Sequence, residues 1–188
     1  MQKNERQGGF GKRKIFLRVE YMNRFVTVGQ LSYDLLSEID RKNLTWEPSL
    51  FDGVVDHTVR KSSSCNVMDK RLADLIYEEI KWAFPEREGY VSYLNPMIRF
   101  LRYKEGDFFF SHYDENYVDD EGGQSEYTLQ VCLNTCIGGA LTFIKPALQM
   151  ECERGTFVLF HQDYEHKVEK IKAKERYVMR TELLYKKC

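Results

Sequence analysis

The stretch Phe108-Phe109-Phe110-Ser111-His112-Tyr113-Asp114 decides how this sequence is interpreted. It is rich in aromatic residues, which favour strands, and successive side chains of a strand point to opposite faces. We therefore expect the imidazole of His112 and the carboxylate of Asp114 to emerge on one face. A His-x-Asp pair alone is weak evidence for a metal site, because a strand histidine beside an aspartate is usually polar surface.

Two residues further along the chain strengthen the metal hypothesis. His166 follows Asp114 by 52 residues, and Arg176 follows His166 by ten. Two imidazoles and one carboxylate form the facial ligand set of non-haem Fe(II), which leaves positions open for other molecules. A guanidinium beside such a site can pair with an acidic co-substrate. Oxygen ligands alone would instead suit Mg²⁺ or Ca²⁺, and sulfur ligands alone would suit zinc.

The chain has two other histidines, His57 and His161. His161 competes with His166 for the third ligand position, but it directly follows the apolar run Phe157–Phe160. It is interpreted either as a strand-end residue or as one that supports the metal ligands without binding the metal. His57 lies between Asp56 and Thr58 and is interpreted as a structural or surface histidine. The predicted metal ligands, which are also the predicted catalytic residues, are His112, Asp114 and His166.

Composition and charge exclude several classes of protein. At 188 residues, the chain fits one domain, and 43% apolar and 14% aromatic residues indicate a packed core. With 28 basic and 29 acidic residues, the net charge of −1 gives no general attraction to nucleic acid or to an anionic membrane. No apolar stretch approaches the ~20 residues that span a bilayer. The N-terminus lacks the apolar region of a signal peptide, so we expect a cytoplasmic protein.

The five cysteines are scattered. Cys132 and Cys136 have a Cys-x-x-x-Cys spacing, but no second pair completes a zinc site. Cys132 lies in an apolar strand pattern and is interpreted as a buried reduced thiol. A reducing compartment agrees with the cytoplasmic expectation.

Pattern changes predict the organisation of the chain. Residues 1–13 are interpreted as a flexible N-terminal segment and residues 14–188 as a single domain, with an α/β supporting part over 14–96 and a catalytic β-core over 97–186. Apolar residues at helical spacing predict helices over Gln30–Lys42 and over Asn66–Phe84, the second with Asn66 as N-cap and Pro85 after its end. Lys14–Val19 is predicted to be a strand.

Short strands separated by turn residues dominate the remainder. They are expected over Met97–Tyr103, Phe108–Asp114, Tyr127–Asn134, Ala140–Ile144, Thr156–Phe160 and Arg176–Tyr185. Many short strands at this spacing indicate a sandwich or jelly roll. The fold class is therefore predicted to be α+β, with a jelly-roll core buttressed by N-terminal helices.

Several of these segments together resemble one known family. The segments are Arg102–Gly106, Phe110–Asp114, Gly139–Phe143, Gly155–His166 and Arg176–Thr181. They look like the metal-binding, Gly-Gly-x-Thr-x-Phe, distal-ligand and co-substrate segments of the prolyl 4-hydroxylase-like 2-oxoglutarate/Fe(II) dioxygenases. The resemblance spans residues 97–185, with a weaker echo around Arg60 and the serines that follow it.

The resemblance implies a double-stranded β-helix and a set of site residues. Iron would be held by the three predicted ligands, Arg176 would bind the far carboxylate of 2-oxoglutarate, and the Tyr103 hydroxyl would also reach this co-substrate. Arg180 and Lys174 remain alternatives to Arg176, although Arg180 would sit ~13 Å further along the same strand face. The family usually has glycine where this chain has Lys174, so we expect the turn before Arg176 to differ locally.

The resemblance also implies an activity. Family members use Fe(II), 2-oxoglutarate and O2 to hydroxylate a C–H bond and release succinate and CO2. The resemblance leaves open whether ascorbate serves as a reductant. A peptidyl proline is the expected substrate; a small-molecule hydroxylase and a non-catalytic jelly-roll binding module are the alternatives. A nucleic-acid demethylase is disfavoured, because the chain has no basic stripe and no Arg-x-Asn-x-x-x-x-Arg pattern.

The acidic loop after His112 has more than one interpretation. The acidic loop Asp114–Glu121 could favour a basic peptide, close over the substrate or simply be solvated. The oligomeric state is not indicated by any pattern in the sequence.

Overall fold

A nine-stranded sheet forms the larger layer of the computed structural model, which describes residues 15–21 and 24–188. The predicted flexible segment 1–13 lies outside the described residues. The strand order is β1-β2-β13-β9-β16-β7-β5-β3, and β6 also pairs with β16. The bounds are β1 Ile15–Tyr21, β2 Arg24–Gln30, β3 Glu47–Pro48, β5 Ser63–Met68, β6 Tyr90–Leu94, β7 Met97–Tyr103, β9 Gln124–Cys132, β13 Thr156–His161 and β16 Arg176–Lys187.

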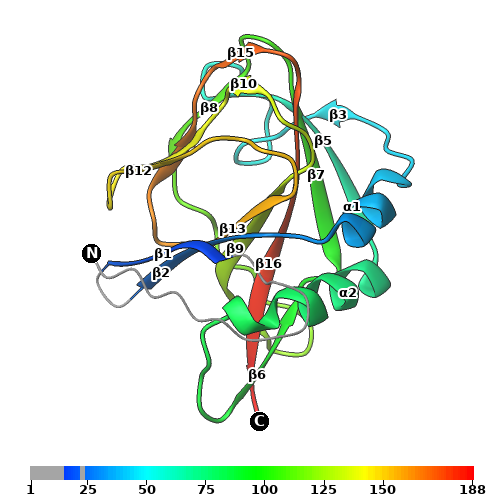
Figure 1. Ribbon diagram of the computed structural model, residues 1–188, viewed down its shortest axis with the longest axis vertical. Coiled ribbons are helices and arrows are strands. Elements are labelled where there is room, and N and C mark those ends of the chain that lie inside the picture. Colours follow the sequence, from blue (N-terminus) through cyan, green and yellow to red (C-terminus); the bar gives the residue numbers. More distant parts are fainter. Residues whose placement is uncertain (1–14, 22–23) are drawn as a thin grey trace.

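A five-stranded sheet of order β12-β11-β14-β8-β4 forms the smaller layer, and β10 pairs separately with β15 (Figure 1). The bounds are β4 Arg60–Lys61, β8 Phe108–His112, β10 Ile137–Gly138, β11 Leu141–Phe143, β12 Leu148–Met150, β14 His166–Val168 and β15 Ile171–Ala173. Buried side chains of the two sheets pack together, as where Leu101 and Val178 of the large sheet join Phe109 and Val168 of the small one. The two layers form a jelly roll.

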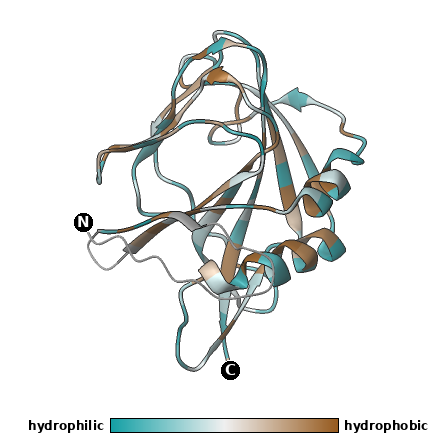
Figure 2. Cartoon of the chain, in the orientation of Figure 1, coloured by the Kyte–Doolittle hydropathy of each residue, from teal (hydrophilic) through white to brown (hydrophobic). Residues whose placement is uncertain are grey.

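The opposite face of the large sheet is covered by the two α-helices of the described residues, α1 Tyr33–Asp40 and α2 Lys70–Ile80. Leu36 and Ile39 of α1 and Ile76 of α2 belong to the same buried cluster as Phe100 and Met179 of the sheet. Figure 2 shows hydrophobic and hydrophilic residues alternating along both helices, as expected for helices with one buried face. In the described part of the chain, no helix is long and apolar enough to cross a membrane.

The predicted start of the second helix is wrong. Asn66 lies in β5, where it pairs with Arg99 of β7, and α2 begins only after Asp69, whose carboxylate accepts a hydrogen bond of 2.9 Å from the Leu72 N–H. Strand pairing thus takes residues that the sequence pattern assigned to the helix. At its other end, α2 gives way to a 3₁₀ turn, Lys81–Ala83, which ends just before Pro85.

Candidate metal centre

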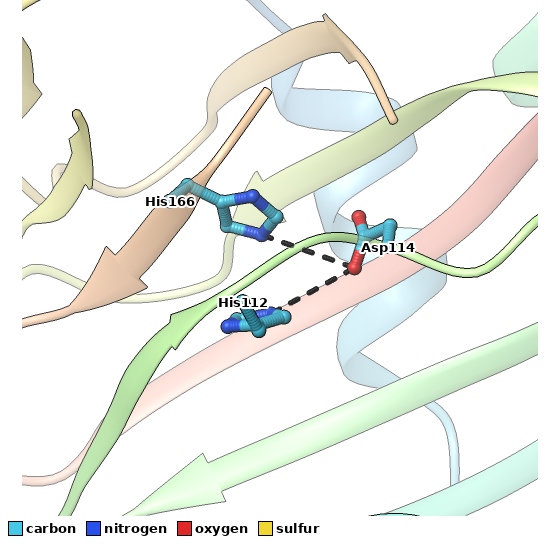
Figure 3. Close-up of side chains that lie close together, drawn as sticks. All are labelled: His112, Asp114 and His166. Carbon is cyan, nitrogen blue, oxygen red and sulfur yellow. Dashed lines mark ion pairs between the residues drawn. The ribbon is translucent and has the colours of Figure 1, made fainter. Parts of the chain in front are cut away.

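His112, Asp114 and His166 meet between the two sheets. His112 ends β8, His166 begins β14, and the two residues pair directly across these antiparallel strands. Asp114 lies two residues beyond the end of β8, so the predicted strand Phe108–Asp114 is too long by those two residues. The Nε2 atom of each histidine lies 3.8 Å from Oδ1 of Asp114 (Figure 3). The three side chains are therefore placed to hold one metal ion.

Backbone carbonyls orient both imidazoles in the same way. Nδ1 of His112 lies 2.8 Å from the carbonyl oxygen of Phe110, and Nδ1 of His166 lies 2.8 Å from that of Tyr164. A carbonyl can only accept, so each Nδ1 carries the proton and each Nε2 presents its lone pair toward Asp114. This arrangement fixes the tautomer that a metal-binding histidine needs.

The Asp114 carboxylate is also held in place. The backbone N–H of Asp114 donates to the Gln162 carbonyl at 3.3 Å, and Thr128 Oγ1 donates to Oδ2 of the carboxylate at 2.5 Å. A guanidinium nitrogen of Arg180 lies 3.0 Å from Oδ1, the oxygen that faces both imidazoles. The orientation of the carboxylate is thus determined by contacts on both of its oxygens.

Burial sets the charge state of the three groups. Loss of solvent lowers the pKa of His112 to about 3, and it also lowers the pKa of His166. Burial opposes the charge of Asp114, but Arg180 and the two histidines hold the pKa of its carboxyl below the usual range. At neutral pH the site therefore presents two neutral imidazoles and one carboxylate, the forms that bind a metal.

Aromatic side chains form the walls of the site. The Phe109 ring stacks on His112 with centroids 3.6 Å apart, and Phe160 lies edge-on to His166 at 4.8 Å. The triad lines a small cavity together with Leu101 and Tyr103 of the large sheet. These walls limit the access of water to the three polar groups.

Arg176 lies on the same strand face as Arg180 but deeper in the fold. It is fully buried, and none of its three guanidinium nitrogens has a hydrogen-bond partner within the described residues. It pairs directly with Tyr103 across β16 and β7, and its guanidinium carbon lies 5.3 Å from the centre of the Tyr103 ring. Burial opposes its charge, but the negative charge of the neighbouring Cys152 thiolate raises its pKa. Hydrogen bonds from Cys132 and Cys136, together with the charge of Arg176, lower the pKa of Cys152 to about 3. A buried cation with unused donors fits the carboxylate of an acidic ligand.

The two alternatives to Arg176 have different surroundings. Arg180 points to Asp114 and lines the cavity at the metal triad. Lys174 is exposed, and its backbone adopts φ 62°, the left-handed conformation that glycine favours. The turn therefore keeps a glycine-like backbone, and the local difference expected there is in the side chain.

The two other histidines lie away from the triad, and two further residues contact the site. His161 ends β13 with its ring edge-on to Tyr127 at 5.1 Å, and His57 lies in an exposed turn; neither joins the triad. Sequence reasoning missed the contact of Thr128 with Asp114, for which the sequence has no signal. It also missed that Cys152 lies near Arg176, because residues distant in sequence carry no pattern of their contact.

Residues 98–181 match the family described as the 2OG-Fe(II) oxygenase superfamily. No curated protein matches the chain. Three solved structures, each similar at low sequence identity, share its fold.

One is the viral collagen prolyl hydroxylase of Paramecium Bursaria Chlorella virus-1 with 2-oxoglutarate, which is 19% identical with a TM-score of 0.53 over 67% of this chain and 80% of that one. A prolyl-4-hydroxylase of Pseudomonas putida is 18% identical with a TM-score of 0.57, covering 84% and 91%. HygX of Streptomyces hygroscopicus, with nickel, 2-oxoglutarate and hygromycin B bound, is 10% identical with a TM-score of 0.56, covering 84% and 82%.

Proposed function

We propose that this chain, whose residues 98–181 belong to the 2OG-Fe(II) oxygenase superfamily, hydroxylates a C–H bond of its substrate and converts 2-oxoglutarate to succinate and CO2. The family uses Fe(II), 2-oxoglutarate and O2. One observation carries the proposal for this chain: the His112, Asp114 and His166 triad lies in the same fold interior as the fully buried guanidinium of Arg176, whose nitrogens have no hydrogen-bond partner among the described residues.

Each of these side chains is assigned a role. His112, Asp114 and His166 hold Fe(II), which when bound supplies the activation of O2. Arg176 binds the far carboxylate of 2-oxoglutarate, because its unused donors match a carboxylate bidentately. Tyr103, which pairs with Arg176 and also lines the metal cavity, supports the same co-substrate through its hydroxyl.

The surrounding residues orient the ligands and limit solvent. The carbonyls of Phe110 and Tyr164 keep the two Nε2 lone pairs directed inward, and Thr128 holds the second oxygen of Asp114. The rings of Phe109 and Phe160 cover the imidazoles and reduce competition from water.

We propose a peptidyl proline as the substrate. This is supported by the sequence resemblance to prolyl 4-hydroxylases and by two structures of the same fold that are named as prolyl hydroxylases. A small-molecule substrate is the second candidate, because the HygX structure of the same fold contains hygromycin B.

Succinate release from 2-oxoglutarate with Fe(II) and O2 tests the activity. We expect His112→Ala and Arg176→Ala to lose at least ~100-fold in turnover, while His161→Ala, a histidine outside the triad, keeps it. If the two site variants match wild type both in turnover and in iron-dependent 2-oxoglutarate binding, the oxygenase assignment is wrong. A proline-peptide array, read by the mass gain of one oxygen atom, then tests the substrate class.

A further inference from the structure

A row of polar residues crosses the large sheet beside the metal triad. Arg180 of β16 pairs with Arg99 of β7 on one side and with Gln130 of β9 on the other, and Arg99 pairs with Asn66 of β5. Directly paired residues of neighbouring strands share a face. Arg180 and Gln130 line the metal cavity, so Arg99 lies on the face of the sheet that looks toward it.

Two arginines directly opposite each other are unfavourable unless anions compensate them. Burial lowers the pKa of Arg99, and the nearby charge of Arg180 lowers it further. Arg99 donates from Nε to the Asn66 side chain at 3.3 Å, and in the described part of the chain no carboxylate lies within 4.0 Å of its guanidinium. Within the described residues, Arg99 thus has no carboxylate in direct contact, and only the more distant charges of Glu182 and Asp114 favour its charged form.

Arg180 has two carboxylate partners, but the nearer one, Asp114, also belongs to the metal triad. Its contact at 3.0 Å is Oδ1 of Asp114, the oxygen that also faces both histidine Nε2 atoms. A metal held by the triad would compete with Arg180 for the Asp114 carboxylate, whose Oδ2 already accepts a hydrogen bond from Thr128. The other carboxylate, that of Glu182, lies 3.7 Å away, and the Nε of Arg180 has no hydrogen-bond partner in the described part of the chain.

Arg99 and Arg180 lie apart from Arg176, the residue proposed to bind the far carboxylate of 2-oxoglutarate. Arg176 is four residues before Arg180 on the same strand, which corresponds to ~13 Å along an extended chain. One carboxylate cannot occupy both places, so the far carboxylate of 2-oxoglutarate, held at Arg176, does not use the donors of Arg99 and Arg180. A carboxylate that binds to these two arginines while 2-oxoglutarate is already bound belongs to another molecule.

We propose that Arg99 and Arg180 together bind a carboxylate of the substrate, close to the carbon that is hydroxylated. The inference rests on the proposed function and narrows its substrate class to molecules that carry such a group. The carboxylate is either an acidic side chain next to the target residue of a peptide or the acid group of a small molecule. Two adjacent guanidinium groups recognise either one through charge-assisted hydrogen bonds.

Acetate and acetamide, which differ in charge but hardly in size, are suitable probes. The protein is loaded with paramagnetic Mn(II) and saturating 2-oxoglutarate, and the NMR relaxation of the probes' methyl protons is measured. We expect wild type to bind acetate roughly tenfold more tightly than acetamide near the ion. Arg99→Gln is the informative variant because Arg99 touches no triad residue, and it should lose this preference.

Arg102→Gln provides the matched control. Arg102 lies on the same strand with the same charge, but on the other face, where its guanidinium lies 5.0 Å from the centre of the Trp46 ring. This variant should keep the wild-type preference for acetate. Equal relaxation by the two probes in wild type, or an unchanged preference in Arg99→Gln, overturns the inference.

Succinate release then identifies the source of the carboxylate. One pair of substrates is a proline peptide with Glu or Gln beside the proline, and the other is free L-proline and L-prolinamide. Faster turnover of the Glu peptide than of the Gln peptide indicates that the carboxylate belongs to a peptide substrate. Faster turnover of L-proline than of L-prolinamide indicates a small molecule. Equal turnover within both pairs counts against the inference. Failure to bind 2-oxoglutarate in the Mn(II) sample would instead overturn the proposed function.

Discussion

His112 and His166 are direct partners across β8 and β14, with ring centroids 4.3 Å apart, although 54 residues separate them in sequence. This pairing turns a His-x-Asp motif into a three-residue site, because it places the second imidazole on the same side as Asp114. The register of the small sheet is therefore the structural basis of the candidate metal centre.

Removing either imidazole should abolish tight metal binding. His112→Ala and His166→Ala each lose one of three ligands, and we expect a loss of ~100-fold or more in affinity for Fe(II) or Co(II). Anaerobic titration monitored by the Co(II) absorption spectrum measures this loss. His161→Ala is the control and should bind one ion as wild type does; equal affinity in all the variants would show that the ion binds elsewhere.

Arg176→Met should separate ligand binding from stability. The variant replaces a buried cation, which has no hydrogen-bond partner among the described residues, with an apolar side chain of similar length. The ligand-free protein should therefore gain about 1–4 kcal/mol in free energy of unfolding. Urea denaturation measures this gain, and calorimetry should show that 2-oxoglutarate binding is lost. Retained binding, with metal affinity unchanged, would transfer the anchor role to another cation.

Tyr103→Phe should weaken 2-oxoglutarate binding mildly. Only a hydroxyl is removed, which corresponds to about 0.5–1.5 kcal/mol, or up to about tenfold in affinity. The buried ring remains packed against Arg176, so stability and metal affinity should not change. Calorimetric titration with 2-oxoglutarate checks the change, and an affinity equal to wild type would reduce Tyr103 to a packing residue.

The cap of α2 should make stability depend on pH. Hydrogen bonds from Lys42 and from the Leu72 N–H hold the pKa of Asp69 below its usual value. Its contribution is therefore present above the unfolded pKa of about 3.9 and is lost as pH falls through the lower folded value. Asp69→Ala should cost about 1 kcal/mol at pH 7 and less below pH ~3. Urea denaturation at both pH values measures this, and a cost independent of pH would exclude the carboxylate as its source.

Lys174→Gly should stabilise the turn before Arg176. A non-glycine residue at φ 62° is strained by ~1 kcal/mol or more, and the side chain is exposed. Relief of that strain should raise the free energy of unfolding by about 1 kcal/mol in thermal or urea denaturation. Lys172→Gly, an exposed lysine within β15, is the comparison and should be destabilising.

The sequence indicated the three residues of the triad and seven of the sixteen strands of the described residues, but it was less accurate at element ends. Met97–Tyr103 was predicted with the bounds that β7 has, whereas the start of α2 was placed at Asn66, because local propensity cannot see the pairing of β5 with β7. The strand Arg24–Gln30 was not predicted, although it pairs with β13 inside the large sheet.

The sequence by itself determined the residue types of the candidate site: two imidazoles, a carboxylate and a later arginine, spaced on runs that form strands. These are properties of residue type and local periodicity, which a single chain displays directly. Only the tertiary structure decided that Arg176 is fully buried with no hydrogen-bond partner among the described residues, and that Arg180 faces Asp114 and Arg99. Burial and register depend on which strands pair and how the two sheets pack, and no local pattern contains that information.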